Sequence, residues 1–97
     1  GCTVRLTRDL HIPPVSLNAQ LLEQLEICCH ALKLTCRRMS SGAGHDCMHF
    51  APRIPSAMFF LPSRDGRSHC PQEYTSPDQL SYGASLLSNL LYRLAWV

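Results

Sequence analysis

The apolar run AMFFL at residues 57–61 decides how this chain is expected to fold. It is bounded by Pro55 and Pro62, and five consecutive apolar residues between prolines are typical of a strand covered on both faces. Such strands belong to parallel sheets with helices on both sides. The run therefore predicts an α/β fold, although the chain supplies only some of the neighbouring strands that it needs.

Two loops flank this run, and each carries one histidine among small residues and beside a carboxylate. The first reads SSGAGHD at residues 40–46 and contains His45, and the second reads GRSHCPQEYTSP at residues 66–77 and contains His69. An accessible imidazole whose tautomer is fixed by a neighbouring acid suits a metal ligand or a donor to an oxyanion. One strand between the loops is expected to hold both at one edge of the sheet.

Helices are predicted on either side of the loops. Apolar residues recur every three or four positions from Leu17 to Leu32, which predicts an amphipathic helix over residues 18–32. A short helix is expected over residues 45–51. SPDQ at residues 76–79 is a capping box with proline at the first helical position, so it predicts the start of a C-terminal helix that packs on the sheet.

The N-terminal residues predict a separate strand. Val4, Leu6 and Leu10 alternate with polar residues over residues 3–10, which is the pattern of a half-buried, antiparallel strand. The pair Pro13-Pro14 ends this pattern and stiffens a linker, because proline fixes φ and donates no hydrogen bond. A crossing between two domains is therefore expected here.

Composition narrows the classes of protein further. The 97 residues make at most one small domain, which buries about 60–65% of its unfolded surface. The net charge of +2 comes without a basic stripe interleaved with aromatics, so nucleic-acid binding has little support. The sequence has neither an apolar run of about 18 residues nor a secretory signal in its first 20 residues, so no membrane partner is expected. The chain begins inside a strand-like run without Met, which is expected of a piece of a longer protein.

Six cysteines leave two interpretations open. A high hydrophobic content of 45%, an adjacent pair at Cys28 and Cys29 on a predicted helix, and the length of the predicted helices favour reduced thiols in a cytoplasmic protein. No C-x-x-C pair is present, so a structural zinc knuckle is not expected either. As reduced thiols, most of them would be small buried hydrophobes. The alternative is a small, disulfide-stapled secreted module.

The motifs closely resemble those of a known family. The order SGAGHD at 41–46, P-x-x-M-x-F-x-P-S at 55–63 and G-x-S-H-x-P-x-E-Y-T-S-P at 66–77 is similar to the C-terminal catalytic segment of the ureido amidohydrolases. These are the allantoate amidohydrolases and N-carbamoyl-L-amino-acid hydrolases, within the dinuclear-metal aminoacylase-type peptidases. The resemblance implies that residues 1–12 are the last strand of an α+β dimerisation (lid) domain. Residues 13–97 would be the C-terminal part of a zinc-exopeptidase-like catalytic domain, a mixed sheet flanked by helices.

The resemblance also implies roles for individual residues. His69 would bind one of two divalent metal ions, zinc or manganese. His45 would be the catalytic residue that binds the substrate and polarises its scissile carbonyl or ureido group, with Gly44 and Ser68 as further substrate contacts. Asp46 would orient His45 or cap the following helix, and Glu73 would support the loop or the metal ligand.

Two positions depart from the family pattern. Cys70 stands where the family usually has Asn, and Arg67 stands where an apolar residue is common. These departures are the best support for a rival interpretation, in which the chain is a non-catalytic interaction piece or a degenerate homologue.

The implied reaction is hydrolysis of a linear amide or ureido C–N bond in a small molecule such as allantoate or an N-carbamoyl amino acid. The other metal ligands, the general base and the arginine that clamps the substrate lie outside this chain in the family. The fragment is therefore expected to be inactive alone and to need the rest of the enzyme, which would be a homodimer. The residues decide neither the substrate nor the choice between zinc and manganese.

Overall fold

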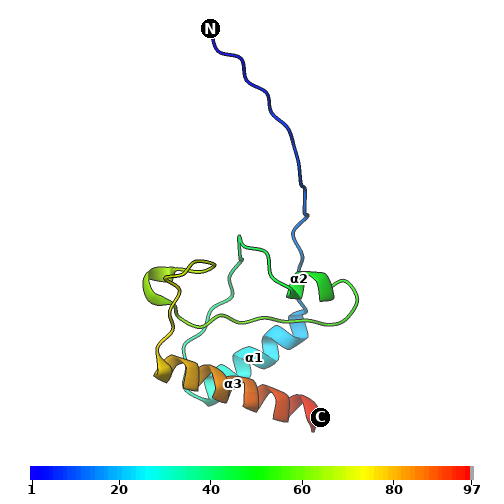
Figure 1. The fold of residues 1–97 in the computed structure, drawn as a ribbon. Coiled ribbons are helices and arrows are strands. Elements are labelled where there is room, and N and C mark those ends of the chain that lie inside the picture. Colours follow the sequence, from blue (N-terminus) through cyan, green and yellow to red (C-terminus); the bar gives the residue numbers. More distant parts are fainter. Residues whose placement is uncertain (97) are drawn as a thin grey trace.

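Helices and long connecting loops make up the structure. The computed structural model describes residues 1–96, with helices α1 (Ala19–Ala31), α2 (Cys47–Phe50) and α3 (Pro77–Ala95) and one 3-10 turn, η1 (Arg64–Gly66). Figure 1 shows α1 and α3 crossing at the base, with the loops that carry α2 and η1 spread above them. The N-terminal residues leave this body as an extended arm, so the longest dimension is 64 Å.

Helix α1 begins and ends where the sequence predicts. The Asn18 side chain caps it by accepting a 2.9 Å hydrogen bond from the backbone N–H of Leu21. Just beyond the helix, Lys33 takes a positive φ of 57°, and the N–H of Leu34 donates to the carbonyl of Cys29 at 2.9 Å. A left-handed residue after the last turn is a common way to end a helix. It turns the chain back toward the glycine loop.

Helix α3 begins at the predicted capping box. The Ser76 hydroxyl accepts from the N–H of Gln79 at 3.3 Å, and the Gln79 side chain accepts from the N–H of Ser76 at 3.4 Å. These reciprocal bonds satisfy two N–H groups that no helical carbonyl can reach. The start of the C-terminal helix is therefore confirmed.

The core lies where α1 and α3 pack together. Five residues are buried, and partly buried side chains from the connecting segments pack around them. The buried set is Leu25, Cys28, Cys29, Leu86 and Leu90. Across the rim, the Arg93 guanidinium donates to the Gln24 side-chain oxygen at 2.9 and 3.1 Å. This is a small core, so the fold depends on a few apolar contacts between the two long helices.

The predicted sheet does not form within residues 1–96, which contain no strand. Residues 57–61 cross the molecule as an extended segment, and residues 3–10 lie in the arm with Val4 85% and Leu6 96% exposed. A strand is defined by hydrogen bonds to a neighbour, and this chain supplies none for either segment. The expectation of an α/β fold is therefore corrected for the chain by itself, and the mixed sheet and the dimerisation strand are unconfirmed.

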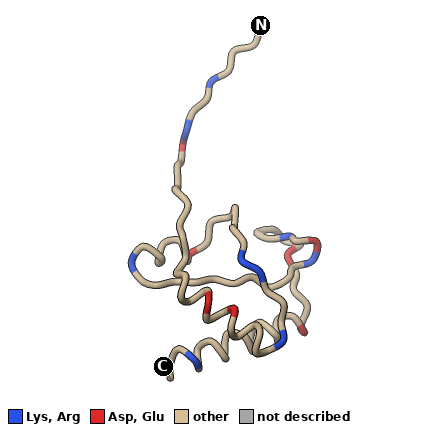
Figure 2. The backbone as a smooth tube through the Cα atoms, turned by 180° about the vertical axis from the view of Figure 1, so that it is seen from behind, with Lys and Arg blue, Asp and Glu red and all other residues tan. Residues whose placement is uncertain are grey.

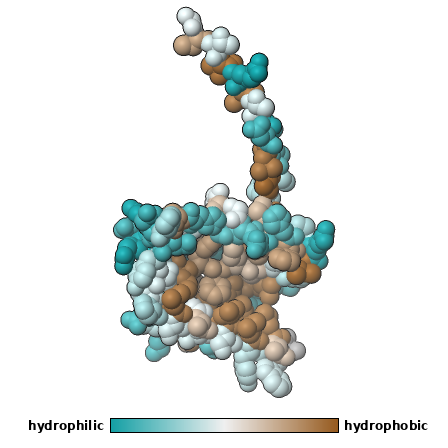
Figure 3. Space-filling model, viewed as in Figure 1, coloured by the Kyte–Doolittle hydropathy of each residue, from teal (hydrophilic) through white to brown (hydrophobic). Residues whose placement is uncertain are grey.

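An apolar hollow remains at a place where further helices or strands of the predicted fold would be expected to pack. It has a volume of about 1200 Å³ and lies between the two long helices and the segments around residues 34–39 and 58–62. Figure 3 shows apolar side chains gathered in this hollow, below a rim of hydrophilic loops. An open apolar surface of this kind marks a place where a partner packs.

The cysteines are all unpaired thiols. Cys28 and Cys29 lie in the core, but Cys2 and Cys36 are exposed, so the expectation that most of them are buried is wrong. Burial, together with a hydrogen bond to the Cys36 thiol, raises the pKa of Cys29 to about 11. Cys29 therefore stays protonated at neutral pH, as a small core hydrophobe does.

Charged groups are scattered over the surface. Figure 2 shows Lys and Arg dispersed among acidic residues along residues 1–96, without a continuous basic band. Within the same residues, no helix combines the length and the apolar character needed to cross a bilayer.

Gly83 sets how closely α3 approaches the extended segment. A Cβ at this buried glycine would lie 2.6 Å from Cδ1 of Leu61. Gly83→Ala should therefore fail to yield the stabilisation of about 1 kcal/mol that this change normally gives inside a helix. Urea unfolding in a double-mutant cycle with Leu61→Ala tests this, because the gain should reappear once the Leu61 side chain is removed. The full gain in the wild-type background would contradict this account.

The thiols should divide into two reactivity classes. We expect Cys2 and Cys36 to react quickly with a thiol reagent at neutral pH, whereas Cys28 and Cys29 react only after unfolding, because burial blocks access of the reagent. Timed labelling with mass-spectrometric mapping measures this order. Equal rates at Cys28 and Cys2 would contradict the packing, and fewer than six reactive thiols in denaturant would favour the disulfide module.

Candidate functional site

The two histidine loops meet above the extended segment. The rings of His45 and His69 lie edge to face, with centroids 5.2 Å apart and an interplanar angle of 75°. The Phe60 ring lies 5.2 Å from that of His45 on the segment that connects the loops. The two loops do come together, but the run between them is an unpaired extended segment and not the predicted strand at the edge of a sheet.

The first loop is held by the Ser41 hydroxyl. Its oxygen accepts from the N–H of Ala43 at 3.2 Å, lies 3.3 Å from the Ala43 carbonyl, and lies 3.1 Å from Nε2 of His45. The loop then passes into α2, whose first turn includes a bond from the N–H of Met48 to the carbonyl of His45 at 3.0 Å. His45 is thereby fixed through both its ring and its backbone.

The glycines of this loop are not required by their backbone angles. Gly42 and Gly44 have no positive φ, and a Cβ at Gly44 would meet only Sδ of Met48, at an ordinary 3.6 Å. At Gly42 it would meet nothing within 4 Å. The contacts within residues 1–96 leave room for side chains here, so close approach of a ligand is a better reason for glycine than the turn itself.

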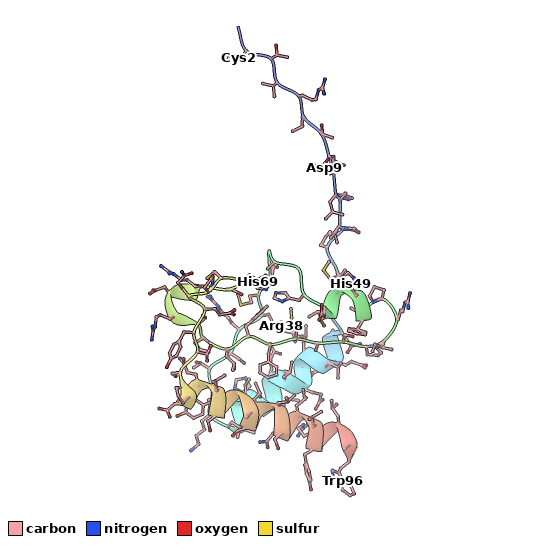
Figure 4. All side chains as sticks on the ribbon, in the orientation of Figure 1. Cys2, Asp9, Arg38, His49, His69 and Trp96 are labelled. Atoms are coloured by element: carbon pink, nitrogen blue, oxygen red, sulfur yellow. The ribbon has the colours of Figure 1, made fainter. Side chains whose placement is uncertain are left out.

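The second loop is closed on itself by hydrogen bonds. The Thr75 hydroxyl donates to the carbonyl of Pro62 at 2.9 Å, and the N–H of Arg64 donates to the carbonyl of Tyr74 at 2.8 Å. The Arg64 guanidinium also lies 4.3 Å from the centre of the Tyr74 ring, a cation–π contact. The loop is thus a defined unit, and Figure 4 shows His69 at its upper face.

His69 is exposed and has a backbone conformation that is costly for its residue type. Its φ is 56°, in the left-handed region, and Asp65 and Gly66 of the same loop also have positive φ. A non-glycine residue there costs about 1 kcal/mol or more, and such strain clusters at functional sites. The strain presents an accessible imidazole next to His45.

The remaining predicted site residues differ in the hydrogen bonds that they make in the two loops. Ser68 donates a long, 3.5 Å hydrogen bond to the Glu73 carboxylate, and the N–H of Glu73 donates to the carbonyl of Cys70 at 3.0 Å, so both contacts of Glu73 lie within the loop. Asp46 stands at the start of α2, but its side chain makes no capping hydrogen bond and its helix is a single turn. The orientation of His45 by Asp46 is likewise not seen, since the hydrogen-bond contact of the ring is between its Nε2 atom and Ser41.

Sequence reasoning missed Ser41 and Phe60 as neighbours of His45. The only signal for Ser41 is its position four residues before His45 across a glycine turn. Phe60 was assigned to the strand core, but without a sheet above it the ring is 45% exposed and turns toward His45.

An ion pair ties the first loop to helix α1. The Arg38 guanidinium bonds both carboxylate oxygens of Glu26 at 2.8 Å. The hydrogen bond from Arg38 lowers the pKa of Glu26, and the same bond raises that of Arg38. Bidentate geometry of this kind fixes direction as well as distance. Arg38 lies just before the glycine loop, so the pair anchors the loop's start.

The described residues do not form a complete metal centre by themselves. Within residues 1–96 there is no group of three or more His, Cys, Asp or Glu side chains able to hold a metal ion. His69 offers an exposed imidazole on a rigid loop, which meets the needs of a single ligand. A complete centre would require ligands from polypeptide beyond this chain.

Comparisons with known proteins identify the family. Peptidase family M20/M25/M40 matches residues 2–93. The allantoate amidohydrolase of Escherichia coli (strain K12) is 47% identical over 83 residues, which is 86% of this chain and 20% of that protein. The N-carbamoyl-L-amino-acid amidohydrolase of Paenarthrobacter aurescens is 38% identical over 94 residues, 97% of this chain and 23% of its own length.

These matches cover most of this chain but only a small part of each relative. It spans about a fifth of the length of the curated relatives it matches. The allantoate amidohydrolase of Bacillus subtilis (strain 168) is 52% identical over 62 residues, which is 64% of this chain and 15% of that protein. The family match covers nearly every residue, including both histidine loops, and the chain therefore belongs to peptidase family M20/M25/M40.

Proposed function

We propose that this chain is the C-terminal portion of an amidohydrolase that cleaves a linear ureido or amide C–N bond. The observation that carries the proposal is the pair of histidine rings 5.2 Å apart on two loops whose motifs resemble the ureido amidohydrolases. Relatives named for allantoate and N-carbamoyl amino acids support this class of substrate. The proposal leaves open which of these compounds is bound.

His69 is the proposed metal ligand. Its exposed ring sits on a loop held by its own hydrogen bonds, so binding would require little rearrangement. A pair of divalent metal ions, when bound, supplies Lewis-acid activation of water for hydrolysis. Imidazole serves zinc and manganese alike. Glu73, which accepts a hydrogen bond from Ser68, would keep this loop in shape.

His45 is the proposed contact to the group that is cleaved. It lies against His69 and Phe60, with exposed backbone at Gly44 on one side. A substrate near the metal would therefore meet the His45 ring, the Gly44 backbone and the Ser68 hydroxyl together. Asp46 makes no hydrogen bond to this ring, so we assign it no direct role in the chemistry.

The rest of the enzyme would complete both the fold and the site. The apolar hollow and the unpaired extended segment at residues 57–61 are surfaces that further polypeptide can cover. The exposed apolar residues of the arm, Val4, Leu6 and Leu10, would join a separate dimerisation domain over residues 1–12. We therefore propose a homodimeric full-length enzyme, located in the cytoplasm, where its free thiols stay reduced.

Replacing His69 tests the metal assignment. In the full-length enzyme, His69→Ala should remove one ligand, lower metal content and reduce turnover at least a hundredfold, as metal analysis and steady-state kinetics would measure. His30→Ala changes an exposed histidine on α1 and serves as the matched control.

His69→Gly separates metal binding from loop structure. Glycine tolerates the φ of 56° without strain, so this variant should fold at least as stably as the wild type and still lose metal. Normal metal stoichiometry in both His69 variants would refute the ligand assignment.

The isolated chain should not catalyse hydrolysis. With one candidate ligand, we expect no turnover of allantoate or N-carbamoyl amino acids and only weak zinc uptake by calorimetry. Adding the N-terminal portion in trans should restore metal uptake. No uptake under those conditions would favour a non-catalytic interaction piece.

A further inference from the structure

The His45 ring is held by a polar contact that has no part in the chemistry proposed above. Its Nε2 atom lies 3.1 Å from the hydroxyl oxygen of Ser41, and within residues 1–96 its Nδ1 atom has no hydrogen-bond partner. The Phe60 and His69 rings pack against the same imidazole and limit its rotation. The two ring nitrogens are therefore in different surroundings.

The three contacts of Ser41 can be satisfied together in only one way. A serine hydroxyl donates one hydrogen bond and accepts two. Its oxygen accepts from the N–H of Ala43 and can donate its single proton to the Ala43 carbonyl. The third contact must then be accepted as well, so Nε2 of His45 is the donor. Donation from Ser41 to Nε2 would instead leave the Ala43 carbonyl without this partner.

We propose that Ser41 is a positioning residue that holds the His45 ring in the tautomer with its proton on Nε2, which leaves the Nδ1 lone pair available to a ligand. The identity of the ligand rests on the proposed function. A ureido or primary amide group carries N–H donors, and Nδ1 accepts one of them. His45 thus contributes a hydrogen bond to substrate nitrogen, which orients the C–N bond to be cleaved.

This role differs from the one that the sequence implies. A neutral ring with its only proton on Nε2 has no N–H to offer to a substrate oxygen at Nδ1. Recognition at this position therefore selects compounds with an N–H group next to the scissile carbon. An ester of the same shape has no such donor and leaves the Nδ1 lone pair without a partner.

Nitrogen NMR of the ring tests the proposal on the 97-residue chain itself. At a pH of about 8.5, where an ordinary imidazole is neutral, the ¹⁵N shifts of His45 report which nitrogen carries the proton. We expect a single Nε2–H tautomer in the wild type. Ser41→Ala should shift both ring nitrogens toward the averaged values of a mixed population. A proton on Nδ1 in the wild type, or an unchanged spectrum in Ser41→Ala, would overturn the proposal.

Two further variants separate positioning from loop structure. Ser40→Ala removes the neighbouring hydroxyl, which makes no such contact, and should leave the His45 signals unchanged. Ser41→Thr keeps an Oγ atom and should restore the single tautomer. If Ser40→Ala changes the tautomer as much as Ser41→Ala, the effect belongs to the loop as a whole, and the proposal fails.

Kinetics of the full-length enzyme link the contact to the substrate. Ser41→Ala should lower kcat/KM by roughly three- to tenfold, the worth of one neutral hydrogen bond, while metal content stays normal. This outcome does not depend on whether His69 is a metal ligand. If the His69 variants keep their metal, the proposed function fails, but the tautomer measurement on the isolated chain still decides the role of Ser41.

Discussion

The contact between α1 and α3 is the constraint on which the rest of the structure depends. Its small core leaves little apolar burial to hold the body together, and Gly83 lets the extended segment lie close against α3. That segment carries Phe60, which in turn packs against His45. The position of the candidate site therefore depends on how closely the extended segment at residues 57–61 can approach α3.

Local signals in the sequence predicted the helices well. Signals for strands, which need a second segment to pair with, did not predict what the structure shows. The capping box at Ser76 and the apolar spacing before Leu32 act within a few residues, so the chain satisfies them alone. The runs at residues 3–10 and 57–61 have the composition of strands, but neither pairs with another segment within residues 1–96. A strand requires two hydrogen-bonded segments, so its composition alone does not form it.

The candidate site was predicted in outline and missed in detail for the same reason. Two histidine loops on either side of one extended run must come together, and the rings of His45 and His69 do so. The contact of Ser41 with His45 depends on the path of a glycine turn, which composition does not specify. The expected cap at Asp46 is not formed, and this residue has helical backbone angles (φ −56°, ψ −31°) in place of the extended ones typical of a capping residue.

The unpaired extended segments have a consequence for how this chain behaves by itself. The backbone at residues 57–61 presents donors and acceptors beside apolar side chains, and the arm does the same. Such edges recruit strands from other copies and lead to aggregation. Solution work on the chain thus requires concentrations at which it stays monomeric.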